Sequence, residues 1–527
     1  MTTVERKEPR TIYPYLIAVF PSLSLYAANT ADVRVYELIA PLGLAVFVTA
    51  LLMFAMRPAI RSVHLRAVLV GLFWGTFFTY SVWSRVLRTG IGFDREFRGA
   101  EKLALAVVAF GLAVALLVAI RRVRVELSGF SRFMNVAVLI AVTIPCLNSA
   151  RWNVQSWMTP SPVLLPLSQP SLPSGVSPNI YFFILDAYTS EGYLQTAFGF
   201  DNSAFVSDLR ASGFYVADES HSNYSVTRYS IPATLNLDYV HMLVPGTPEW
   251  ELIPNQLVTK LMHENAAIGF LRQRGYEIVC IDSGLTFSQI RDADRFLSPP
   301  WDGAGQTRTS LGARLGLTAF QSVLAGMTPL RSFLLSRHAV VGRNRWDPDF
   351  KVRGVPYALT TAATVTADSK PMFVLAHILS PHPPNRFDAQ GNVLEVAPAF
   401  ADGYIQEIQF INARIIEMVA AIRSRDPGAV IVLQGDHGPW ADYYGGLSAW
   451  PGTREGLVEE RTRILNAVYT TSEELKGKLY PEISPINTFR SIFNVYFGAN
   501  LPLLSERSCV CAWDDCAEYF WVDWSQP

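Results

Sequence analysis

The stretch Asn179-Ile-Tyr-Phe-Phe-Ile-Leu-Asp186 decides the fold, because a short apolar run ends there in a carboxylate. A second run, Ala429-Val-Ile-Val-Leu433, is followed closely by Asp436 and His437. Strands buried in a parallel sheet have this continuous apolar character, and such sheets bind ligands beyond the carboxyl ends of their strands. Two carboxylates and an imidazole at that edge are suitable ligands for a divalent cation. The two runs therefore predict a parallel sheet that carries a metal-dependent active site.

Strand-like and helix-like segments alternate from Asn179 to the C-terminus. The candidate strands are 179–185, 277–281, 371–377, 429–434 and 464–469. Helical periodicity is found at 201–212, 256–274, 402–425 and 487–497. Such alternation is typical of an α/β fold with a mostly parallel sheet, and we expect one large domain over residues 179–527.

Residues 1–150 contain five apolar stretches that are typical of membrane-spanning helices, which need about 20 residues. The stretches are 13–28, 36–56, 67–83, 103–120 and 134–147. Only 17% of the whole chain is charged, against about 25% in ordinary soluble domains. Buried core helices are the alternative, but arginine-bearing loops separate the successive stretches. The sequence therefore predicts an N-terminal bundle of five transmembrane helices.

Basic loops orient membrane proteins, because Lys and Arg accumulate on the cytoplasmic side. Arginines lie in the N-terminal segment, in the loop before the third stretch and in the loop before the fifth. The loop from Arg85 to Lys102 is also basic, against this rule, and we interpret it as a contact for lipid headgroups or an anionic substrate. With five spans, everything after the fifth lies outside the cytoplasm. A Pro- and Ser-rich linker, 151–178, then leads to the external domain.

Charge and cysteine usage narrow the possible partners. The net charge is −1 and there is no basic tract, which argues against nucleic acid. Cys509, Cys511 and Cys516 cluster near the C-terminus, and in an oxidising compartment two of the three can pair and staple the tail. A zinc site made of these cysteines alone lacks a fourth ligand.

Two further polar segments supply candidate catalytic groups. In Asn223–Pro232, Thr227 precedes a plausible helix, whose N-terminus favours phosphate. Ser225 and Ser230 are the rival nucleophiles in this segment. Asn223 and Arg228 flank Thr227 and are candidate substrate contacts.

The other segment, His377–Pro384, contains two histidines. His377 lies within a strand-like run, so it is either a core histidine or a substrate contact. His382 lies beyond that run and is the better candidate for binding phosphate during catalysis.

These four clusters, in this order after five apolar stretches, resemble the alkaline phosphatase/sulfatase superfamily. The layout is similar to that of membrane-anchored lipoteichoic acid synthases and lipid A phosphoethanolamine transferases. In those enzymes an acidic residue after the first strand, a threonine nucleophile and an Asp-His pair hold one metal. The resemblance implies these ligands here: Asp186, Thr227, Asp436 and His437. The His-x4-His spacing of the phosphoethanolamine transferases matches His377 and His382.

The resemblance implies an enzyme of the bacterial inner membrane with an extracytoplasmic catalytic domain. It would move a phosphoglycerol or phosphoethanolamine group from a phospholipid to a glycan or lipid, through a phospho-threonine. The implied cofactor is one divalent ion, Mn, Mg or Zn.

No histidine follows His437, which argues against a complete second metal site. The segment Ser230–Thr234 lacks the arginine of the sulfatase pattern, which disfavours formylglycine chemistry. A sulfatase-like hydrolase or phosphodiesterase, and a catalytically silent membrane binding protein, are the alternatives.

The basic loops predict on which side of the membrane two positions of the chain lie. A reporter fused after Glu126 should be cytoplasmic, and one fused after Ser177 should be external. Alkaline phosphatase and fluorescent protein fusions in cells measure this directly. An external signal at Glu126 would contradict the predicted orientation.

Overall fold

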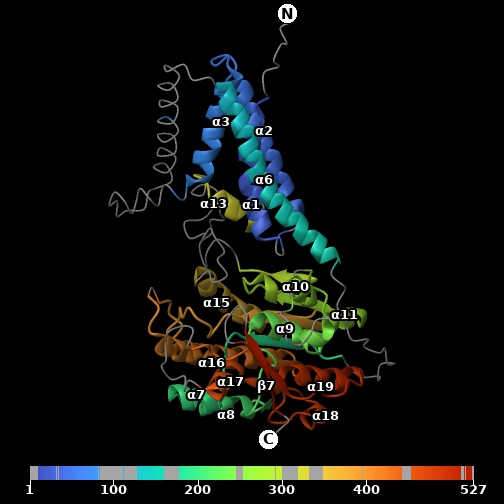
Figure 1. Cartoon of the computed structure of the whole chain (residues 1–527). Helices are drawn as coiled ribbons and strands as arrows, with labels where there is room; N and C mark the ends of the chain where they lie inside the picture. The colour runs from blue at the N-terminus through green and yellow to red at the C-terminus, as the bar shows by residue number, and fades with distance from the viewer. Residues whose placement is uncertain are drawn as a thin grey trace, which may run out of the picture. The chain divides into compact units, whose positions relative to one another are not determined.

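The structure is a computed structural model. It describes residues 10–30, 33, 35–80, 82, 111, 127–158, 177–244, 253, 255–290, 292–299, 319–330, 348–394, 396–441, 453–511, 516 and 518–524. The chain forms two compact units (Figure 1). The first comprises 1–158 and 300–344, and the second comprises 159–299 and 345–527.

The first unit is helical. Its main helices are α1 (Tyr13–Ala28), α2 (Ile39–Ala55, preceded by the 3-10 turn η1, Val35–Leu38), α3 (Val63–Phe78) and α6 (Leu127–Met158). They pack together in Figure 1, and Asn135 of α6 accepts hydrogen bonds from the Ile12 and Tyr13 amides at 3.0 Å. This side chain therefore caps the N-terminus of α1, which has no cap of its own.

Two of the described helical segments, Val35–Ala55 and Leu127–Val154, are long and apolar enough to cross a bilayer. The other two, Tyr13–Ala28 and Val63–Phe78, are apolar but shorter. The predicted span 103–120 lies outside the described residues, apart from residue 111. Large apolar side chains point outward, including Phe47 on α2 and Phe133 on α6, which are 65% and 66% exposed. An outer surface of this kind suits lipid rather than water.

Two boundaries differ from the sequence prediction. Helix α6 continues past Arg151 to Met158, because the first proline of the expected linker is Pro160. Helix α13 (Ala319–Gly326) belongs to the first unit, where Phe320 packs with Tyr26 and Leu38. The predicted domain 179–527 is therefore interrupted by a segment that contributes to the helical unit.

The second unit is built on a seven-stranded sheet in the order β2-β7-β6-β1-β5-β3-β4. The strands are β1 (Ile180–Leu185), β2 (Phe214–Val216), β3 (Glu277–Ile281), β4 (Arg295–Leu297), β5 (Met372–Ile378), β6 (Val430–Gly435) and β7 (Asn466–Tyr469). Strands β6, β1, β5, β3 and β4 run parallel, whereas β7 is antiparallel to β6 and β2 is antiparallel to β7. All five predicted strands are present, and the α/β class with a mostly parallel sheet is confirmed.

Helices cover both faces of this sheet. Strand β1 alternates between them, with Tyr181, Phe183 and Leu185 on one face and Ile180, Phe182 and Ile184 on the other. The first face packs against α7 (Glu191–Phe198), α8 (Ser203–Ala211), α15 (Pro348–Thr364) and α16 (Phe400–Arg425). The second packs against α9 (Thr227–Asn236), α10 (Asn255–His263), α11 (Ala266–Gln273), α18 (Glu473–Lys476) and α19 (Pro485–Phe497). Burial on both sides explains why β1 is apolar throughout.

The predicted helix 256–274 is divided in two. Helix α10 ends at His263, and the Asn265 side chain accepts a hydrogen bond from the Ile268 amide at 2.8 Å, which starts α11. An asparagine at this position is a favoured N-cap.

The remaining short elements are the 3-10 turns η2 (Val240–Leu243) and η3 (Thr286–Ser288), the helix α17 (Arg454–Thr462), and a separate antiparallel hairpin of β8 (Arg507–Cys511) and β9 (Tyr519–Asp523). A disulfide joins Cys511 to Cys516 within the hairpin. The prediction that two of the three C-terminal cysteines pair is confirmed, with Cys509 left as a buried thiol.

The core around β1 predicts a large stability effect. Phe182 is 1% exposed and meets the Phe489 ring edge-on at 4.6 Å, whereas Phe296 on the edge strand β4 is 37% exposed. Phe182→Ala should lower the free energy of unfolding by about 3–5 kcal/mol. Phe296→Ala, the matched control, should lower it by much less. Chemical denaturation followed by tryptophan fluorescence measures both, and equal losses would contradict this account of the core.

Candidate metal centre

Strand register brings the two predicted carboxylates together. Leu185, the last residue of β1, pairs with Ile378 of β5 and with Gly435 of β6. Asp186 and Asp436 therefore leave neighbouring parallel strands at the same edge. The Ala187 amide donates to Asp436 Oδ1 at 3.1 Å, so the turn after β1 directly contacts the turn after β6.

Three carboxylate oxygens at this edge are buried without a hydrogen-bond donor among the described residues: both of Asp186 and Oδ2 of Asp436. Burial, reinforced by Asp436, raises the pKa of Asp186 well above its usual range. Burial also acts to raise the pKa of Asp436, but His437 and His377 outweigh it and hold that pKa below its usual value. Buried carboxylates without donors are costly unless a cation compensates them. These orphaned oxygens fit a divalent metal.

His437 turns its Nε2 toward these oxygens. Its Nε2 lies 3.6 Å from an oxygen of each carboxylate, Asp186 Oδ1 and Asp436 Oδ2. Its Nδ1 lies 2.7 Å from the Gly438 carbonyl, which can only accept, so Nδ1 carries a proton and donates it there. Histidines that bind metals usually donate their other N–H in this way.

His377 has the same arrangement, although the sequence left open that it was a core histidine. Its Nε2 lies 3.5 Å from Asp186 Oδ2 and 3.9 Å from Asp436 Oδ2, and it has no hydrogen-bond partner among the described residues. Its Nδ1 lies 2.8 Å from Ser288 Oγ, and that hydroxyl donates to the Leu285 carbonyl at 3.1 Å. Ser288 therefore accepts from Nδ1–H. The Nε2 lone pair of His377 is left facing both carboxylates.

His382 also presents Nε2, because its Nδ1 lies 2.6 Å from the Pro383 carbonyl. Burial lowers the pKa of His382 to about 3 and that of His377 to about 4, so both rings are neutral at neutral pH. A neutral ring in this tautomer accepts at Nε2, which suits a cation better than the phosphate contact that the sequence suggested for His382.

A buried ion pair supports the loop that carries His382. Lys351 of α15 donates to the His382 carbonyl at 2.6 Å and to Glu407 Oε2 at 2.5 Å. Glu407 of α16 also accepts from the Ser380 hydroxyl at 2.8 Å and from the Arg386 and Phe387 amides at 2.5 and 3.3 Å. Burial lowers the pKa of Lys351, although Glu407 opposes this shift. Breaking such a buried, fully bonded pair is costly.

The ligand-type atoms form two overlapping groups. One is Asp186, His382 and His437, and the other is Asp186, His377 and Asp436, each with its ligand atoms within 4.8 Å of one another. Two ligands of a tetrahedral zinc ion, each about 2.0–2.2 Å from it, lie about 3.5 Å apart, close to the separations found here. The sequence argued against a complete second site because no histidine follows His437. Upstream histidines instead enlarge the donor set beyond what one tetrahedral ion needs.

Thr227 lies beside this cluster as the first residue of α9, where the helix dipole favours an anion. Its Oγ1 is 3.1 Å from His437 Nε2. The rival Ser225 instead accepts a hydrogen bond from the Cys511 amide at 2.8 Å, and Ser230 is buried one turn further into the helix. Among these three hydroxyls of the described residues, that of Thr227 contacts the cluster, at His437 Nε2.

Close backbone contacts explain the glycines on either side of Asp436-His437. A Cβ on Gly435 would lie 2.2 Å from the Tyr188 carbonyl oxygen, and one on Gly438 would lie 1.8 Å from the Glu460 carbonyl oxygen. No side chain fits at these distances, so glycine allows the two ligands to sit against neighbouring turns.

Two suggested substrate contacts have other roles in the structure. The Asn223 amide group donates to Arg507 O and Tyr239 Oη, both at 3.3 Å, and its Oδ1 accepts from the Ile486 amide at 3.1 Å. Its side chain is thus occupied in packing. Arg228 lies over the Tyr229 ring, with 5.1 Å between its guanidinium carbon and the ring centroid.

Sequence reasoning missed Ser288, Lys351 and Glu407. Ser288 lies 89 positions before His377, and Lys351 lies 56 positions before Glu407. None of the three belongs to a motif, and only the folded chain brings them to the histidines.

Comparisons with known proteins give structural similarity alone. No protein-family model matches the chain, and no curated protein matches its sequence. The chain is similar to the C-terminal periplasmic domain of EcEptC from Escherichia coli in complex with Zn, with 12% identity, coverage of 66% of this chain and 93% of that one, and a TM-score of 0.40. It is also similar to the integral membrane lipooligosaccharide phosphoethanolamine transferase A (EptA) from Neisseria meningitidis, with 13% identity, coverage of 92% and 95%, and a TM-score of 0.38.

A protein of the alkaline phosphatase superfamily from Vibrio parahaemolyticus is a third similar structure, with 12% identity, coverage of 69% of this chain and 80% of that one, and a TM-score of 0.37. At these identities and TM-scores, the similarity does not assign a function. A function for this protein has to be inferred from the residues of its own chain.

The orphaned carboxylate oxygens predict that metal binding depends on Asp436. Asp436→Asn keeps the side-chain volume but removes the charge, so metal affinity should fall at least as much as when a supporting residue is lost, about 10–100-fold. Elemental analysis and calorimetric titration with Mn²⁺ and Zn²⁺ measure this. Asp402→Asn, in the exposed first turn of α16, is the control and should bind metal normally. Unchanged affinity in Asp436→Asn would refute the site.

Proposed function

We propose that the protein is a membrane-anchored, metal-dependent phosphotransferase that acts through a phospho-threonine at Thr227. The observation that carries this proposal is the 3.1 Å contact between Thr227 Oγ1 and His437 Nε2, beside two buried carboxylates with three oxygens that lack a donor among the described residues. A nucleophilic hydroxyl, a cation site and a helix N-terminus in one place are what phosphoryl transfer requires. The order of the motifs, which resembles phosphoethanolamine transferases and lipoteichoic acid synthases, supports the same reaction.

The residues that would hold the metal are the two carboxylates and the histidine nitrogens described above, with Thr227 as a further oxygen ligand. A bound divalent ion would lower the pKa of the threonine hydroxyl and neutralise charge on the phosphoryl oxygens. The protein supplies the rest. The N-terminus of α9 favours the anionic group in front of Thr227, and the buried ion pair of Lys351 and Glu407 holds the His382 loop in place.

The reaction has two displacements. In the first, Thr227 Oγ1 forms a bond to phosphorus, the bond from phosphorus to the diacylglycerol oxygen breaks, and diacylglycerol leaves with the proton that the threonine loses. In the second, an acceptor hydroxyl attacks the same phosphorus, the bond to Thr227 breaks, and the threonine regains a proton. Both the transferred group, phosphoglycerol or phosphoethanolamine, and the acceptor, a glycan or lipid, follow from the resemblance.

The helical unit supports a lipid donor. Its two long apolar helices, Val35–Ala55 and Leu127–Val154, are suited to a bilayer, and a membrane anchor keeps the enzyme where phospholipids are concentrated. We propose that the chain crosses the bacterial inner membrane several times and that the catalytic unit is extracytoplasmic. With water as the final acceptor, the same residues would act as a phosphodiesterase, so the product decides between transferase and hydrolase.

Release of diacylglycerol tests the proposal. The purified full-length protein is incubated with labelled phosphatidylglycerol or phosphatidylethanolamine in nanodiscs, with Mn²⁺, Mg²⁺ or Zn²⁺ and with or without an alcohol acceptor. Diacylglycerol release with labelled acceptor supports a transferase, and labelled headgroup phosphate without acceptor supports the hydrolase. No release from either lipid with any metal would refute the transferase. Absence of bound metal would instead favour a binding protein without catalysis.

Thr227 variants test the nucleophile. Thr227→Ala removes the attacking oxygen, so turnover should nearly vanish while metal affinity falls only modestly, because the carboxylates and histidines remain. Thr227→Ser keeps the oxygen and should retain part of the activity. Mass spectrometry of protein quenched during turnover should place the phosphoryl adduct on Thr227. An adduct on Ser225 or Ser230 would show that the nucleophile is misassigned.

A further inference from the structure

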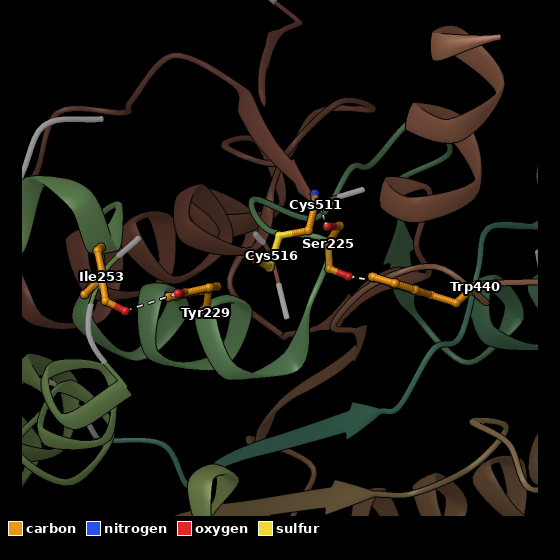
Figure 2. Close-up of a disulfide and its surroundings, with 6 residues drawn as sticks. All are labelled: Ser225, Tyr229, Ile253, Trp440, Cys511 and Cys516. Carbon is orange, nitrogen blue, oxygen red and sulfur yellow. Dashed lines mark hydrogen bonds between the residues drawn. A yellow bond between two sulfur atoms is a disulfide. The ribbon is translucent and has the colours of Figure 1, made fainter. Parts of the chain in front are cut away.

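Ser225, two residues before Thr227, is held by hydrogen bonds at three different atoms. Its amide donates to the Cys509 carbonyl at 3.1 Å, and its Oγ accepts from the Cys511 amide at 2.8 Å. Its carbonyl accepts from Trp440 Nε1 at 2.9 Å. Figure 2 shows Ser225 between Trp440 on one side and the disulfide on the other. Ser225 is fully buried, so water does not compete for these bonds.

The bonds to Cys509 and Cys511 connect Ser225 to the C-terminal hairpin. Strand β8 runs beside the segment before α9, and the Cys509 amide donates to the Asn223 carbonyl at 2.9 Å. The Ser508 hydroxyl donates to the Ser222 carbonyl at 2.6 Å. The disulfide between Cys511 and Cys516 anchors the residue whose amide holds Ser225 Oγ (Figure 2).

The third bond comes from the turn that carries the metal ligands. Trp440 follows His437 by three positions, and it is buried with a positive φ of 55°. The guanidinium carbon of Arg461 lies 3.3 Å from the centroid of its ring, which packs the indole in place. Ser225 therefore joins the segment that leads to Thr227 with the turn that leads from His437.

We propose that Ser225 is a positioning residue that holds Thr227 against His437, and that the disulfide hairpin and Trp440 are its two supports. The inference rests on the proposed function. The segments on either side of the Thr227–His437 contact are both attached to Ser225, so loss of either support lets the attacking oxygen move relative to the cation site. A displacement of about 1 Å can cost on the order of 100-fold in rate. Ser225 is not one of the proposed metal ligands, so its loss should change kcat more than metal affinity or KM.

The test compares two buried serines in the full-length protein. Ser225→Ala removes the acceptor for Cys511, whereas Ser220→Ala, the control, removes a hydroxyl that donates to the Ile483 carbonyl at 2.7 Å. Both are fully buried, and we expect similar losses of thermal stability. Ser225→Ala should lower kcat for diacylglycerol release about 10–100-fold, with KM and Mn²⁺ affinity nearly unchanged. Ser220→Ala should leave kcat unchanged.

Two further variants cover the case in which Ser225→Ala does not fold. Trp440→Phe keeps an aromatic ring but removes the N–H donor, and the Cys511→Ser/Cys516→Ser pair removes the disulfide while keeping β8. Each variant should lower kcat, as Ser225→Ala does, without a matching rise in KM.

The outcomes separate this inference from the proposed function. If the wild-type protein turns over its lipid in a Thr227-dependent way but the Ser225, Trp440 and cysteine variants all keep the kcat of Ser220→Ala, the positioning role is wrong and the proposed function stands. If the wild-type protein shows no Thr227-dependent turnover of either phospholipid, the proposed function fails and this inference fails with it.

Discussion

Three buried carboxylate oxygens of Asp186 and Asp436, which accept no hydrogen bond from the described residues, are the constraint on which the second unit depends. Asp186 and Asp436 follow β1 and β6, whose parallel register ends both strands at one edge, and burial removes the water that would otherwise solvate them. Their repulsion can be relieved by protonation or by a cation. Because three histidines direct ring nitrogens to the same place, the surrounding structure favours the cation.

The histidines and the His382 loop are held in place by hydrogen bonds to neighbouring residues. Two backbone carbonyls and the Ser288 hydroxyl each accept the proton of one ring nitrogen, and each histidine directs its other nitrogen, Nε2, to the carboxylates. Glu407 accepts four hydrogen bonds under the His382 loop, one of them from the buried Lys351. A site that uses imidazoles and buried charges needs such a rigid frame, since each misplaced ligand would leave an uncompensated charge.

The position of Thr227, the proposed nucleophile, depends on parts of the chain that lie far from it in sequence. The hairpin that ends in the Cys511–Cys516 disulfide returns to the segment before α9, and Trp440 reaches the same segment from the turn after β6. The C-terminal residues thus contribute to the site although they contain no catalytic motif. A covalent crosslink here restricts the unfolded chain as well as the local geometry.

Local patterns in the sequence determined the strands, the α/β class, and the positions of Asp186, Asp436 and His437, because apolar runs and the polar residues that end them are short-range features. Motif order added Thr227, His377 and His382. The tertiary structure alone decided the strand order, the antiparallel direction of β7, the length of α6 and the placement of α13. It also decided the role of each histidine nitrogen and the partner of Ser225, which is 286 positions away at Cys511. Contacts over such separations depend on how the helices and strands pack, and no local pattern records that.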